Sequence, residues 1–162
     1  MTYRQSAAGL AVALMVAGCG AAGMSARLTA STEEAELCVP AQVGDGVLIA
    51  HDPLENEGSG DAVLRAVRLV DSTNLQVESF DVLPHGEDGY RGQGPPMDLS
   101  DDVTIGVGES AMVRVNVMLV DPDSAGEAAA FDVEYTDEDG RGSDVVRTSV
   151  TMRVQPQGDW CD

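Results

Sequence analysis

The two histidines, His51 and His85, are the side chains of this chain best suited to acid–base chemistry near neutral pH. A serine hydrolase needs a histidine beside a nucleophilic serine, which often sits in a Gly-x-Ser-x-Gly turn. The sequence contains no such turn. We therefore expect a protein that is not an enzyme and needs no cofactor, with both histidines in loops or at strand ends.

Cys19 follows a run of twelve apolar or small residues, 7–18, and a short start that carries Arg4. The run is too short to span a bilayer, which takes about 20 residues, but it suits the apolar region of an export signal. Residues 16–19, Val-Ala-Gly-Cys, resemble the lipobox of bacterial lipoproteins. The resemblance implies cleavage before Cys19, lipid on its thiol, and a position on the extracytoplasmic side of the cell membrane.

The other two cysteines, Cys38 and Cys161, form an even pair in a chain expected to be exported. Outside the cytoplasm such a pair indicates a disulfide. The alternatives are a pair of metal thiolates and two free thiols.

Two groups of residues suggest metal binding. Asp137, Asp139 and Asp144 look like half of a calcium loop, although the twelve-residue ligand frame of such loops is missing. His85 and Met97 have the imidazole and thioether groups that suit Cu(I). Calcium or copper binding is the alternative function. The same residues are also explained without a metal, as a solvated acidic hairpin and as methionines in the core or in loops.

Residues 84–102 form the longest stretch without a regular pattern and include His85, Tyr90, Arg91 and Met97. Long loops in compact domains are either functional or mobile. If the protein has a recognition surface, we expect it in this loop.

The charge excludes one class of partner. The chain has 162 residues, with 9 basic and 28 acidic side chains and a formal net charge of −19. Such a chain repels phosphate, and only 4% of its residues are aromatic, so we expect no nucleic-acid binding.

Alternation of apolar and polar residues predicts the elements that position these side chains. It is clearest over 111–120, 129–135 and 146–154, and shorter candidates lie at 47–50, 75–83 and 103–107. Residues 62–70 are rich in valine and favour a strand over a helix. Short strands separated by turns predict an all-β, antiparallel β-sandwich of immunoglobulin-like type with seven or eight strands.

Two stretches resemble bacterial extracellular immunoglobulin-like modules. One is the opening pattern formed by Leu54, Asn56 and Gly58, and the other is Val-Gly-Glu-Ser at 107–110, which precedes alternating valines. These modules share no active site, so the resemblance brings no functional residue. The predicted organisation is a signal peptide (1–18), a lipidated cysteine with a flexible tether (19–37) and a sandwich domain (38–162).

Together these features predict a membrane-anchored lipoprotein that acts as a non-catalytic binding or interaction module of the cell envelope. Its expected partners are the lipid bilayer, through the anchor on Cys19, and an envelope protein.

Overall fold

The computed structural model describes residues 24–32, 34–42, 44, 46–84, 92–96, 98–100, 103–159 and 161. These residues form twelve β-strands, and no helix among them is long and apolar enough to cross a membrane. Seven strands have six residues or more, and the other five have two to four; the predicted strand 103–107 is one of the short ones, and the long strand at 35–40 was not predicted. The predicted all-β sandwich is confirmed.

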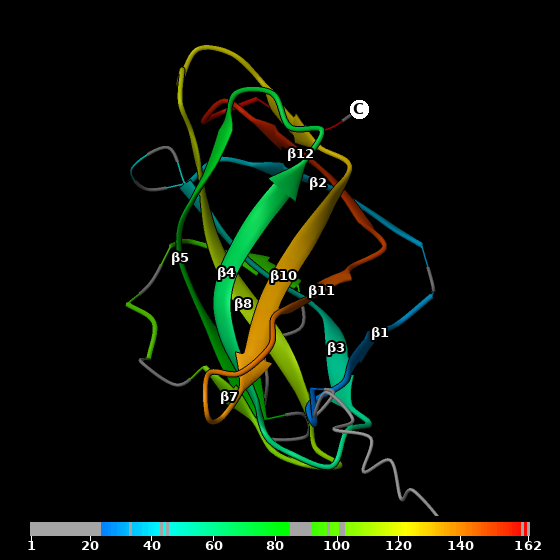
Figure 1. The fold of residues 1–162 in the computed structure, drawn as a ribbon. Coiled ribbons are helices and arrows are strands. Elements are labelled where there is room, and N and C mark those ends of the chain that lie inside the picture. Colours follow the sequence, from blue (N-terminus) through cyan, green and yellow to red (C-terminus); the bar gives the residue numbers. More distant parts are fainter. Residues whose placement is uncertain are drawn as a thin grey trace, which may run out of the picture.

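A five-stranded sheet forms one layer of the molecule (Figure 1). Its centre is β8, the strand with the clearest alternation, which pairs antiparallel with a long strand on each side. One of these long strands, β3, also pairs with two short strands, β1 near its end and β6 near its start. The members are β1 (Leu28–Ala30), β3 (Gly46–Asn56), β5 (Leu75–Pro84), β6 (Gly92–Gly94) and β8 (Ser110–Leu119).

Two smaller sheets complete the sandwich. In the four-stranded sheet, the order is β11 (Asp144–Arg147), β10 (Ala130–Asp137), β4 (Ala62–Val70) and β7 (Thr104–Ile105). In the three-stranded sheet, the order is β2 (Ala35–Pro40), β12 (Val150–Gln155) and β9 (Gly126–Ala128). The pairing of β2 with β12 is parallel, whereas the other strand pairs are antiparallel.

The inner faces of the sheets share one hydrophobic core. Val113 and Val115 of β8 and Val67 and Val133 of the four-stranded sheet line the same small internal void of about 20 Å³. The alternation predicted for 111–120 therefore places valines in the core, where they lose contact with water.

The predicted strand at 146–154 is wrong in one respect, because the chain forms two strands there. β11 belongs to the four-stranded sheet and β12 to the three-stranded sheet. Between them, the buried Thr148 donates its backbone N–H to the carbonyl of Phe131 at 2.9 Å, and its Oγ1 accepts the backbone N–H of Phe131 at 3.1 Å. The hydroxyl holds the bend at which the chain changes sheet, and alternation alone does not reveal such a bend.

The flexible tether predicted for 19–37 is corrected by the structure in its described part. Residues 28–30 and 35–37 lie in strands, and Ala26 and Leu28 are buried in the core. The folded body therefore includes residues from Ser25 onward, well before Cys38.

The disulfide between Cys38 and Cys161 is present, with a Cα–Cα distance of 5.8 Å. Its position follows from the parallel pair, because β2 near the start of the body lies beside the last strand, β12, and Cys38 is opposite Arg153. A turn closed by the hydrogen bond from Asp159 N–H to the carbonyl of Pro156 precedes Cys161. The first and last parts of the fold thus meet through the pairing of β2 with β12, and no eighth long strand is needed to bring the two cysteines together.

Candidate functional site

Several predicted site residues lie outside the described part of the chain. These are the lipidation candidate Cys19 and four residues of the predicted binding loop, namely His85, Tyr90, Arg91 and Met97. His51 lies in β3. No three described His, Cys, Asp or Glu side chains lie close enough together to hold a metal ion.

The three aspartates proposed for calcium point to different partners in the structure. Both carboxylate oxygens of Asp137 accept the backbone N–H of Ser25, at 3.0 and 3.1 Å, and Oδ1 also accepts the N–H of Ala26 at 2.7 Å. Asp144 accepts the hydroxyl of Tyr135 at 3.3 Å. Asp139 is exposed in the turn between β10 and β11. The structure therefore does not bring the three together as a cation site.

The N-terminal segment is anchored by buried polar groups as well as by Asp137. Asn56 is fully buried, and its Oδ1 accepts the N–H of Arg27 at 3.3 Å and that of Gly58 at 3.0 Å. The hydroxyl of Tyr135 accepts the N–H of Leu28 at 3.1 Å. These contacts fix the segment against β3 and β10 at one end of the sandwich.

This arrangement explains the spacing of Leu54, Asn56 and Gly58. Leu54 enters the core, and Asn56 also donates its amide to the carbonyls of Gly60 at 2.9 Å and Ile105 at 3.0 Å. A Cβ at Gly58 would lie 2.3 Å from the carbonyl oxygen of Ser25, so the chain passes too closely for a side chain. The residues that resemble an immunoglobulin-like module are thus structural in this protein.

A buried ion pair lies on the outer face of the five-stranded sheet. Asp81 of β5 is fully buried and faces Arg114 of β8 across the strand pair. Arg114 Nε donates to Asp81 Oδ1 at 2.8 Å, and Nη2 donates to Oδ2, so the pair is bidentate. The hydrogen bond with Asp81 raises the pKa of Arg114 above its ordinary value.

Ser100 attaches the described part of the predicted binding loop to this ion pair. Its backbone N–H and its hydroxyl both donate to Asp81 Oδ2, at 2.8 and 2.9 Å. Because Asp81 is buried and already paired, these bonds hold residues 98–100 in a defined place beside β5.

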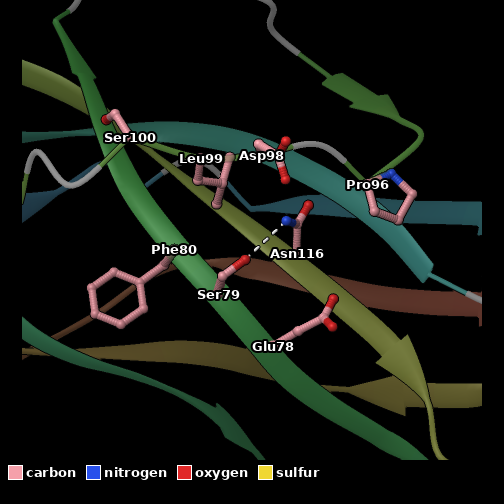
Figure 2. A pocket seen from close by; sticks show the side chains of 8 residues that line it. All are labelled: Glu78, Ser79, Phe80, Pro96, Asp98, Leu99, Ser100 and Asn116. Atoms are coloured by element: carbon pink, nitrogen blue, oxygen red, sulfur yellow. Dashed lines mark hydrogen bonds between the residues drawn. The ribbon is translucent and has the colours of Figure 1, made fainter.

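A groove of about 740 Å³ lies next to the ion pair, between this loop and the two strands (Figure 2). Its floor is Asn116 of β8, whose amide donates to Ser79 Oγ of β5 at 2.9 Å. Asn116 lies between two core valines of β8, so its side chain points to the outer face of the sheet. It is nevertheless only 4% exposed. The full lining is Glu78, Ser79, Phe80, Pro96, Asp98, Leu99, Ser100 and Asn116.

A β-bulge shapes the groove. Val77 pairs with Val117 and Ser79 with Asn116, which leaves Glu78 without an opposite residue on β8. A bulge turns two consecutive side chains toward the same side of a strand. Glu78 and Ser79 therefore both line the groove, and the exposed carboxylate of Asp98 lies on the loop opposite them (Figure 2).

Alternation in 111–120 places Arg114 and Asn116 on the polar face of their strand but gives no sign that a loop covers them. The unpatterned stretch 84–102 is that loop, and its described part supplies Pro96, Asp98, Leu99 and Ser100. Sequence reasoning missed Glu78, because a bulge within a strand leaves no clear signal in composition.

No protein-family model matches the sequence, and no curated protein is significantly similar to it. Among solved structures, PapD-like domain 7 of human CEP192 has a TM-score of 0.41 at 11% identity, over 97% of this chain and 100% of that chain. A non-cellulosomal cohesin of Archaeoglobus fulgidus has a TM-score of 0.33 at 16% identity, over 82% of this chain and 91% of that one.

The VesB protease of Vibrio cholerae has a TM-score of 0.39 at 12% identity, and the match covers 81% of this chain. This chain corresponds to only 32% of the protease chain.

Proposed function

We propose that the protein is a lipid-anchored, extracytoplasmic lipoprotein that acts as a non-catalytic binding module of the cell envelope. The observation that carries the anchor is the Val-Ala-Gly-Cys sequence at 16–19 directly after an apolar run. The disulfide between Cys38 and Cys161 supports export, because such bonds persist in oxidising compartments.

An anchor at Cys19 would act close to the folded body, because folded residues follow soon after it in the sequence. Only four residues, 20–23, lie between Cys19 and Met24, a distance of five positions in the sequence, and the N–H groups of Ser25 and Ala26 are already bound to Asp137. At about 3.5 Å per residue, this linker spans no more than ~18 Å. A lipid on Cys19 would hold the sandwich close to the bilayer.

The groove supports binding as the role of the body. Its wall is fixed to the buried Asp81, so the site is formed before a partner arrives, which reduces the entropy lost on binding. Its two serine hydroxyls take part in hydrogen bonds, that of Ser100 with Asp81 and that of Ser79 with Asn116.

Labelled palmitate tests the anchor. Cells expressing the full chain should incorporate the label into this protein, and Cys19→Ala should abolish incorporation. Cys161→Ala is the matched control, since it removes a cysteine of the disulfide and should leave labelling unchanged. Labelling that persists in Cys19→Ala would refute the anchor.

A further inference from the structure

We propose that the groove beside β5 binds a lysine or arginine side chain of a partner protein, presented on an extended segment that pairs with the outer edge of β5. This inference deepens the proposed binding function by naming the chemistry of the partner. It does not depend on the lipid anchor.

The charge of the groove selects a cation. The carboxylates of Glu78 and Asp98 are exposed on opposite sides of it, and no described basic side chain lines it. Arg114, the neighbouring cation on β8, is turned toward Asp81 and bound to it. A guanidinium or ammonium group would therefore meet two carboxylates that Arg114 does not neutralise.

The remaining lining suits the rest of a long basic side chain. Pro96 and Leu99 form apolar parts of the wall, and both are half-buried (Figure 2). Lysine and arginine pack their aliphatic stems on such surfaces while the charged group stays near water. The hydroxyl of Ser79 and the amide of Asn116 make the floor polar.

The edge of the sheet accounts for an extended segment. β5 has ten residues and is the last strand of its sheet, and among the described strands it pairs only with β8. An edge strand presents a row of backbone N–H and C=O groups that a further strand can bind. The groove lies on the face of the sheet over β5 and β8, so a long side chain of a segment paired with this edge can reach Glu78 across β5.

The probe is a short fluorescent peptide of alternating threonine and lysine, titrated against the full-length protein in detergent micelles with anisotropy as the readout. We expect binding that weakens with salt. The same peptide with glutamate in place of lysine should not bind. Equal binding of both peptides, or no binding of the lysine peptide, would overturn the proposal.

Two variants locate the contact. Glu78→Gln and Asp98→Asn should each weaken binding roughly fivefold, because each removes one exposed charge pair. The matched controls are Glu36→Gln on β2 and Asp123→Asn in the turn after β8, which remove the same charge at exposed positions outside the groove. If the controls weaken binding equally, the peptide is attracted by the net charge alone and the proposal is wrong.

A third peptide tests strand pairing. Methylation of every second backbone nitrogen of the lysine peptide removes the donors needed for pairing and keeps its charge. We expect this peptide to bind more weakly, and equal binding would refute the role of the β5 edge. If the protein binds the lysine peptide but incorporates no palmitate, only the proposal of a lipid anchor is refuted. If it incorporates palmitate but does not bind the peptide, only the proposal for the groove is refuted.

Discussion

Asn56 connects several backbone segments at one end of the sandwich. Its side chain forms four hydrogen bonds to backbone groups, reaching Arg27, Gly58, Gly60 and Ile105. Its own backbone N–H donates to the carbonyl of Glu109 at 3.0 Å. Because the residue is fully buried, water cannot replace these partners if the amide is removed.

We expect Asn56→Ala to lower the free energy of unfolding by about 2–4 kcal/mol, since several buried backbone groups lose their partner. Urea denaturation followed by circular dichroism measures this loss.

Asn74→Gly is the matched control for that variant. Asn74 also binds several backbone groups, including the carbonyls of Asp121 and Ser124, but its hydrogen bonds are exposed. Its φ of 53° suits glycine, so the substitution adds no backbone strain. We expect a loss below about 1 kcal/mol. An equal loss in both variants would contradict the special role of the buried amide.

At the scale of elements, the segment that leads into β1 is held by a carboxylate that titrates. The N–H of Ala26, and then that of Ser25, stabilise the ionised form of Asp137 and lower its pKa below the ordinary value of 3.8. A lowered carboxylate pKa stabilises the folded state above the unfolded pKa, and this contribution is lost as the pH falls through the folded pKa. The attachment of Ser25 should therefore weaken only below pH 3.8.

Nuclear magnetic resonance can follow this step through the amide protons of Ser25 and Ala26. Their chemical shifts should titrate with a midpoint below 3.8. Asp137→Asn should abolish the titration, whereas Asp139→Asn, two residues along the same turn, should leave it unchanged. A midpoint at or above 3.8 would show that the carboxylate is not held in this way.

Elements with a strong local pattern were predictable, and elements made by distant pairing were not. β8 and β10 alternate clearly, because one side of each strand faces the core. β1 has three residues, and β2 forms by pairing with β12 more than a hundred residues later. Residues 28–40 carry little alternation, so only the partner strands reveal that they are strands.

The same reasoning separates the parts of the candidate site. The pairing of Cys38 with Cys161 was predictable from an even count of cysteines in an exported chain. The groove was not, because Glu78 enters it through a bulge and Asp98 through a loop fixed by Ser100 to a buried ion pair. Both features depend on contacts between residues that are far apart in the sequence.

At the scale of the whole molecule, the short linker sets an orientation. Ser25 is attached to Asp137, at the end of the sandwich that carries the turn between β10 and β11, whereas the chain ends at the opposite side (Figure 1). The turn that precedes β8 contacts Asn56, so it lies at the same end of the sandwich as Ser25. The turn at Asp121 follows β8 and therefore lies at the opposite end. Ten residues of strand separate these turns by about 33 Å.

If Cys19 carries lipid, we expect the end near Asp139 to face the bilayer and the end near Asp123 to point away from it. A linker of at most ~18 Å does not let the body turn over, because the two ends lie about 33 Å apart, and repulsion between the acidic body and anionic headgroups disfavours a body that lies on its side. Anionic headgroups repel the acidic turns, so the body should stand off the surface by about the length of the linker.

Fluorophores attached at Asp139→Cys and at Asp123→Cys test this orientation in liposomes whose lipid headgroups carry a spin-label quencher. The fluorophore at residue 139 should be quenched strongly and that at residue 123 weakly, because quenching requires close approach to the headgroups. A long glycine–serine insertion after Cys19 should remove the difference by freeing the body to rotate. Equal quenching at both sites without the insertion would mean that the segment around Ser25 does not hold the sandwich upright on its anchor.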